Sequence, residues 1–214
     1  MKRLLTLGAV FAAAPAFAHH PLAGQPMETF THGLLSGVGH PVLGFDHLFF
    51  IALMGVAALF TGARYMAPLG YIAVMLVGTL MMSFGVALPA IEPMIIASLL
   101  VLGYIVLSGT ALSATTAVIL FAVAGLFHGS AFGESIAAQE AGMGTAVLVG
   151  YLIGLGVIQY VIALTAAWAL EKFWNVSEAS QIQPRIAGAV VAGVGLFLGL
   201  EAVEGVAFAA LGIG

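Results

Sequence analysis

The sequence predicts an all-helical membrane protein, a bundle of six apolar helices that cross the bilayer. Of the 214 residues, 62% are hydrophobic and only 7% are charged, and the mean hydropathy is +1.17. A soluble domain of this length has too little interior to cover so much apolar surface. Helices are the expected spanning elements, because in lipid the backbone polar groups must find partners within the chain.

Composition also excludes several classes of function. The chain has no cysteine, so neither disulfides nor thiolate metal ligands are available. Five Lys and Arg residues are too few for a nucleic-acid-binding surface. The expected partner of the apolar surface is the lipid bilayer. A phosphate-binding GxxxxGK[ST] loop is missing from the sequence, so ATP hydrolysis by this chain is not expected.

The first residues have the pattern of a secretory signal peptide. A basic start is followed by an apolar run too short to span a bilayer comfortably, and Ala16-Phe17-Ala18 is a small-x-small cleavage sequence. We expect a cleaved signal peptide, 1–18, and a single transmembrane domain, 19–214. An uncleaved first helix is the alternative.

Six later segments are long and apolar enough to be spans. Prolines and glycines separate them, and glycine is also frequent within them, which favours close helix packing in a membrane. The expected spans are 43–62, 67–89, 92–112, 115–134, 143–170 and 186–211.

Charge predicts the orientation of these spans. If the mature N-terminus is periplasmic, the remaining basic residues, Arg64, Lys172 and Arg185, all fall in cytoplasmic loops. This distribution agrees with the positive-inside rule for a membrane protein whose mature N-terminus is outside the cytoplasm.

Ionisable side chains at membrane depth are costly unless they pair or bind a ligand. In the expected topology several of them come to the outer half of the bundle, from the start of the first span and the far ends of the fourth and sixth. The candidate metal ligands are His40, Asp46, His47, His128, Glu134 and Glu201.

Spacing relates some of these residues to one another. His40 and His47 are seven residues apart, close to two helical turns, which predicts that they share a helix face. Asp46 is expected either to bind an ion or to orient an imidazole. His128 and Glu134 are six apart and do not share a face, although the two glycines between them allow a distortion or a close backbone approach.

Each of these residues also has a purely structural interpretation. His128 suits a hydrogen bond between helices, and Asp46 suits the first turn of a helix, where it complements the helix dipole. Glu201 and Glu204 suit pairing with other polar groups, and Met54 suits packing. Taken together, these structural explanations need a separate reason for each polar residue at the same depth, whereas a metal site explains them with one. Imidazole and carboxylate groups suit Ni²⁺, Co²⁺, Zn²⁺ or Fe²⁺.

The polar stretches resemble two motifs of the HupE/UreJ permeases. The first motif, HPxxGxDH, is matched by His40, Pro41, Gly44, Asp46 and His47. The second, FHGxAxGxE, is represented over 127–134, and we assign its acidic residue to Glu134. The signal peptide and the six spans also resemble this family, so the resemblance covers the whole chain.

The resemblance implies uptake of Ni²⁺ or Co²⁺, with Zn²⁺ as a less suitable ion, to supply hydrogenase, urease or cobalamin synthesis. It implies transport-site roles for five of the candidate residues: His40, Asp46, His47, His128 and Glu134. The ion is then cargo, and no tightly bound cofactor is expected.

We therefore interpret the sequence as a passive or gradient-coupled divalent metal permease and not as an enzyme. One alternative is an intramembrane zinc-dependent hydrolase, in which the same cluster holds Zn²⁺ with an open position for water. Another is a binding or sensor subunit that works with other membrane proteins.

Overall fold

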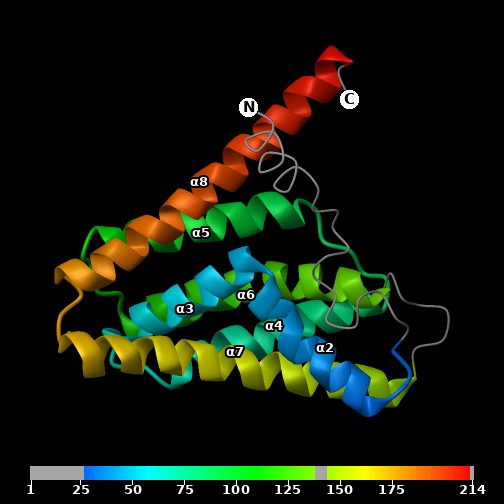
Figure 1. The fold of residues 1–214 in the computed structure, drawn as a ribbon, viewed down its shortest axis with the longest axis horizontal. Helices are drawn as coiled ribbons and strands as arrows, with labels where there is room; N and C mark the ends of the chain where they lie inside the picture. Colours follow the sequence, from blue (N-terminus) through cyan, green and yellow to red (C-terminus); the bar gives the residue numbers. More distant parts are fainter. Residues whose placement is uncertain (1–26, 138–143, 213–214) are drawn as a thin grey trace, which may run out of the picture.

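The computed structural model describes residues 27–137 and 144–212, which form seven α-helices and no strand (Figure 1). The all-helical fold is therefore confirmed for this part of the chain, while the expected signal peptide lies outside it. The helices are α2 (Phe30–Leu43), α3 (Phe45–Leu59), α4 (Met66–Ser83), α5 (Ile91–Leu107), α6 (Ala114–Ala137), α7 (Thr145–Trp174) and α8 (Ile182–Leu211).

Length and hydropathy divide the helices into three groups. Four of them, α4, α6, α7 and α8, are long and apolar enough to cross a membrane. The pair α2 and α3, bent by 81° at the break between them, counts as a fifth span if taken as one. The apolar helix α5 has only 17 residues. Membrane-spanning helices are thus present, and the number of six crossings stays a prediction.

The sequence did not predict α2. Its residues include several glycines and polar side chains, which weaken the helical pattern. Thr29 caps the N-terminus of the helix, and its hydroxyl accepts a hydrogen bond from the His32 backbone N–H at 3.1 Å. Packing also stabilises the helix, because Gly33 and Gly37 lie directly against the backbone of α7.

Glycines lie at the closest contacts between helices. A Cβ added to Gly129 of α6 would lie 2.0 Å from the carbonyl oxygen of Met75 in α4, and one added to Gly55 of α3 would lie 2.0 Å from that of Ala163 in α7. Gly103 of α5 is in similar contact with the backbone of α8. Membrane helices associate mainly through such close packing, so these glycines set the spacing of the bundle.

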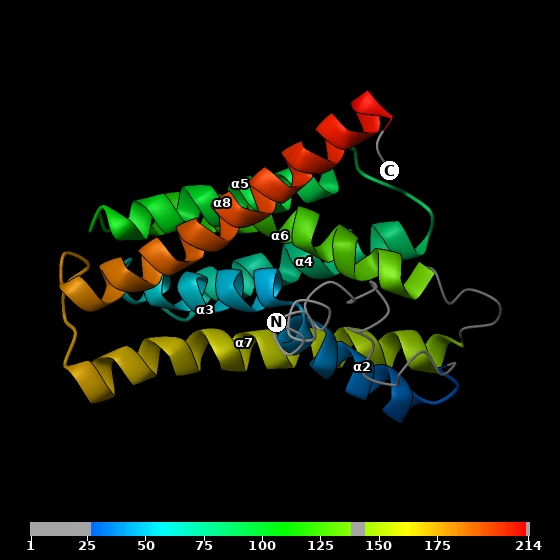
Figure 2. The ribbon, with the colours of Figure 1, turned by 45° about the horizontal axis from the view of Figure 1, so that its top comes forward.

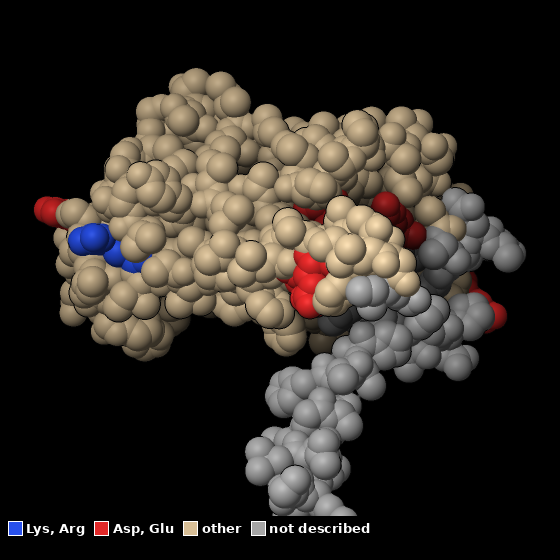
Figure 3. All heavy atoms as spheres, turned by 90° about the horizontal axis from the view of Figure 1, so that it is seen from above, with Lys and Arg blue, Asp and Glu red and all other residues tan. Residues whose placement is uncertain are grey.

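The basic residues gather at one end of the bundle, blue in Figure 3. Arg64 follows α3 and forms a two-point ion pair with Glu171 near the end of α7, with Nη1 2.9 Å from Oε1. These hydrogen bonds raise the pKa of Arg64 above its ordinary value. Arg185 at the start of α8 donates to the Leu107 carbonyl at the end of α5. We call this the basic end.

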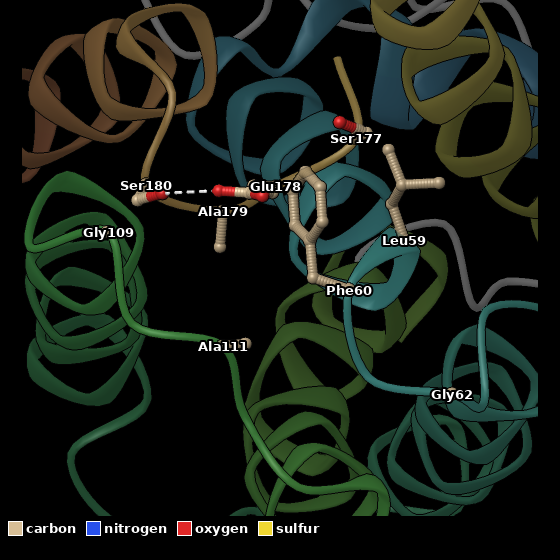
Figure 4. A pocket seen from close by; sticks show the side chains of 9 residues that line it. All are labelled: Leu59, Phe60, Gly62, Gly109, Ala111, Ser177, Glu178, Ala179 and Ser180. Carbon is tan, nitrogen blue, oxygen red and sulfur yellow. Dashed lines mark hydrogen bonds between the residues drawn. The ribbon is translucent and has the colours of Figure 1, made fainter.

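An open pocket of about 510 Å³ lies at the basic end (Figure 4). Its lining comes from the end of α3 and from the loops after α5 and α7, and includes Phe60, Gly109 and Glu178. The Ser180 hydroxyl donates to the Glu178 carboxylate at 3.3 Å.

The glycine contacts predict a selective effect on stability. Gly55→Ala places a methyl group against the Ala163 backbone, so we expect it to lower the free energy of unfolding by about 1–3 kcal/mol. Thermal unfolding in detergent measures the change. The matched control is Gly193→Ala in α8, where a Cβ meets nothing within 4 Å. Equal melting temperatures for the two variants would contradict the close contact.

Candidate metal site

Three histidines from three helices meet in the interior of the bundle. His40 lies in the last turn of α2, His47 in the first turn of α3, and His128 in α6. The ring centroids of His40 and His47 are 6.2 Å apart, and those of His47 and His128 are 5.0 Å apart. His128 is fully buried and His47 is 6% exposed. His47 and His128, which are 81 residues apart in the sequence, are thus in direct contact.

The break between α2 and α3 explains the first of these contacts. The expectation that His40 and His47 share a face of one helix is wrong, because the chain bends by 81° between them. His40 lies in the last turn of α2, whereas Asp46 and His47 lie in the first turn of α3. The imidazoles converge because one helix ends and the next begins beside them.

Gly44 occupies the break. Its backbone is extended, with φ −82° and ψ 99°, and its N–H donates to the His40 carbonyl at 2.9 Å. A Cβ at this position would lie 3.0 Å from Cδ2 of His47 and 3.3 Å from the His40 carbonyl oxygen. A side chain here would therefore press on the His47 ring, which gives the motif glycine a steric reason.

Hydrogen bonds define the tautomer of His128. The Ser98 hydroxyl donates its single proton to the Ile95 carbonyl at 2.7 Å, so toward the His128 ring it acts as an acceptor. The Nε2–H of His128 then donates to Ser98 Oγ at 2.9 Å. In the neutral ring the lone pair is on Nδ1, which lies 2.8 Å from Nδ1 of His47. His47 therefore donates to His128.

The same reasoning applies to His40. The Tyr151 hydroxyl donates to the Phe132 carbonyl at 3.1 Å and accepts a hydrogen bond from His40 Nδ1 at 2.9 Å. The lone pair of the neutral His40 ring is consequently on Nε2. The hydrogen bond to a fixed partner holds the ring in one orientation, as is usual for histidines that bind metals.

Asp46 supplies negative charge beside this group. Its Oδ2 lies 3.7 Å from Nε2 of His47, and its side chain is 30% exposed. The distance is too long for a hydrogen bond, so the contact is electrostatic and its negative charge favours a cation in this region. Asp46 also lies in the first turn of α3, where its charge complements the helix dipole.

Among the described residues, neither Glu134 nor Glu201 is joined to the histidines by a hydrogen bond or an ion pair. Both residues are exposed. Glu134 directly follows Gly133, whereas the second motif has one residue between its last glycine and its glutamate. Glu201 lies in the C-terminal half of α8, and the end of this helix, red in Figure 2, diverges from the bundle. Their participation stays a prediction.

The three histidines lie in a row and do not surround a single point. In the described part of the molecule, no three His, Asp or Glu side chains are grouped as a metal site would require. Aromatic side chains pack against this row of histidines. The ring centroid of Phe132 lies 4.3 Å from that of His47, and the ring centroid of Phe50 lies 4.5 Å from that of His128. An ion here would therefore replace the hydrogen bond between His47 and His128.

The comparisons with known proteins identify the family. The model of the family described as "HupE / UreJ protein" matches residues 7–198. This chain belongs to the HupE/UreJ family. It is 28% identical over 205 residues to Protein HupE of Rhizobium leguminosarum bv. viciae, and the match covers 92% of this chain and 96% of that protein. No solved structure matches. The resemblance inferred from the two motifs is thereby confirmed.

Sequence reasoning missed the residues that orient the imidazoles. Ser98 lies in α5 and Tyr151 in α7, distant in sequence from both motifs, and serines and tyrosines are common in membrane helices. The sequence contains no spacing signal that connects them with His40 or His128. His128 contacts residues of both α3 and α5, as its structural interpretation expects, and its role in metal binding stays a prediction.

The Ser98 contact predicts a tautomer that can be measured. In the unaltered protein we expect His128 to carry its proton on Nε2, and Ser98→Ala to give a mixture of tautomers and a lower melting temperature, because the buried N–H loses its acceptor. Histidine ¹⁵N chemical shifts report the tautomer.

Ser108→Ala is the matched control, since Ser108 also donates to the carbonyl three residues earlier, at 2.7 Å, but is exposed and contacts no histidine. An unchanged His128 spectrum in Ser98→Ala would contradict the assignment.

Proposed function

We propose that this member of the HupE/UreJ family is a permease that takes up Ni²⁺ or Co²⁺ across the bacterial inner membrane. The observation that carries the proposal is the buried contact between Nδ1 of His47 and Nδ1 of His128, 2.8 Å apart inside a bundle of apolar helices. Imidazoles at membrane depth mark ion pathways, and this donor type suits borderline divalent ions.

The broken helix supports the same function. Non-helical backbone at membrane depth is tolerated where it lines a cavity or a binding site, and transporters place their sites at such breaks, near the middle of the membrane. Here the C-terminal end of α2, with His40 in its last turn, points its carbonyl dipoles toward the break. This end favours a cation, and Asp46 offsets the opposing positive dipole of the α3 N-terminus at the same break.

Ion capture follows from the hydrogen bonds. An entering cation competes with the His47 N–H for the lone pair on Nδ1 of His128, while Ser98 and Tyr151 hold the rings of His128 and His40. Asp46 offsets part of the positive charge. Histidine and a single carboxylate bind a divalent ion firmly enough to remove its water, and transport requires that this binding also be reversible.

We also propose that the basic end faces the cytoplasm, with the mature N-terminus periplasmic and the pocket beside Glu178 as part of the inner mouth. Transport is then passive or coupled to a gradient, and the ion serves hydrogenase, urease or cobalamin synthesis. A zinc-dependent hydrolase would instead retain its metal. Flux of the ion with no hydrolysis distinguishes the permease from this enzyme.

Orientation can be tested with single cysteines, since the chain has none of its own. We expect Ser180→Cys, in the exposed loop at the basic end, to react with an impermeant thiol reagent only in inverted vesicles. Glu92→Cys, at the opposite end of α5, should react only in intact cells or right-side-out spheroplasts. The reverse pattern would contradict the proposed topology.

Transport itself is tested in proteoliposomes that contain the purified protein. We expect measurable influx of Ni²⁺ and Co²⁺, slower influx of Zn²⁺, and a loss of about tenfold or more in the initial rate for His47→Gln. His32→Gln is the control, because His32 lies on α2 and its imidazole accepts a hydrogen bond from the backbone N–H of Glu28, away from the other histidines in the described part of the chain. Wild-type flux in His47→Gln would refute the site.

A further inference from the structure

Two buried oxygen atoms deeper in the bundle have no hydrogen-bond partner among the described residues. They are the hydroxyl oxygen of Tyr71 in α4 and Oε1 of Gln159 in α7. Both residues are 0% exposed. A buried polar atom without a partner is unfavourable, so its presence in an apolar interior calls for an explanation. The candidate metal site uses neither of them.

Both residues lie beside Met75, which is also fully buried. The Gln159 amide nitrogen contacts the Met75 sulfur at 3.7 Å and donates to the Leu155 carbonyl at 3.0 Å, so the orientation of the amide is defined. Tyr71 precedes Met75 by one helical turn and shares its face of α4. Gln159 and Met75 are therefore in contact between α7 and α4, and Tyr71 lies on the same face of α4 as Met75.

This region adjoins the histidines on the side of the basic end. The Tyr71 ring lies 6.1 Å from the His128 ring and 5.6 Å from the Phe50 ring. Gln159 lies eight residues after Tyr151, the partner of His40, which corresponds to about 12 Å along α7. Because α7 runs toward the basic end, Gln159 is deeper than the His40 contact by roughly that distance.

The chemistry of the three groups is suited to a cation in transit. A phenol oxygen, an amide oxygen and a thioether sulfur are neutral donors, and they bind a divalent ion more weakly than imidazole and carboxylate do. A path of several sites, each weak enough to release its ion, is what conduction requires. A cation leaving the histidines toward the basic end would meet these donors next.

We propose that Tyr71, Met75 and Gln159 form a second, uncharged binding site for the transported divalent cation, between the histidines and the basic end. This inference rests on the proposed function. In it the histidines capture the ion, and the inner site receives the ion before release. The two unpartnered oxygens are then ligands that act only while an ion passes.

The experiment compares flux with binding in the same purified variants. We expect Tyr71→Phe and Gln159→Leu to reduce Ni²⁺ influx into proteoliposomes about tenfold, while equilibrium binding of Ni²⁺ at the histidines in detergent stays within about twofold of wild type. Tyr160→Phe is the control, because its hydroxyl lies one residue from Gln159 but only contacts the Tyr65 carbonyl, at 3.4 Å.

Gln159→Glu tests the inner site by a gain of binding. The side chain keeps its shape and acquires a charge, so we expect Ni²⁺ to raise the melting temperature of this variant more than that of wild type, and efflux of the ion to slow. A melting temperature that Ni²⁺ raises no more than in wild type would overturn the inference.

The outcomes separate this inference from the proposed function. If wild type and His47→Gln carry no Ni²⁺ or Co²⁺, the proposed function fails. If wild type transports and both Tyr71→Phe and Gln159→Leu match it, only the inner site fails. Loss of Ni²⁺ binding at the histidines in Tyr71→Phe would show that Tyr71 merely packs against His128, and would also overturn the inner site.

Discussion

Close contact between helix backbones is the constraint on which this structure depends. In lipid no hydrophobic force drives apolar helices together, so they must gain contact area by approaching closely. Glycines make this possible between α2 and α7 and between α4 and α6. The first contact brings His40 to Tyr151, and the second fixes α6, which carries His128. The glycines at the contacts between helices therefore determine where the imidazoles meet.

The polar interior is organised by hydrogen-bond direction. Ser98 and Tyr151 each give their proton to a backbone carbonyl and accept one from an imidazole. This arrangement keeps a lone pair on a defined nitrogen of His128 and of His40, in surroundings too apolar for an unpaired charge. In the proposed function, a cation would meet imidazoles whose orientation is already set, and the half-buried Asp46 would supply negative charge beside them.

Sequence reasoning was most successful for periodic and compositional features. The helical class, the segments that became α3 to α8 and the clustering of Arg64 and Arg185 at one end all follow from hydropathy and charge. It failed at α2, because Gly33 and Gly37 look unfavourable for a helix until α7 is packed against them. It also placed His40 and His47 on one continuous helix, since spacing alone does not reveal a bend.

The sequence by itself determined the class of protein and the chemistry of its candidate site. Apolar composition predicts helices in lipid. The two motifs identify the imidazoles and carboxylates that are candidate ligands. Only the tertiary structure decided which of them meet. The contact of His47 with His128 and the hydrogen bonds of Ser98 and Tyr151 to the imidazoles depend on helix contacts between residues distant in sequence. Such contacts arise from the fit of surfaces, which no local pattern encodes.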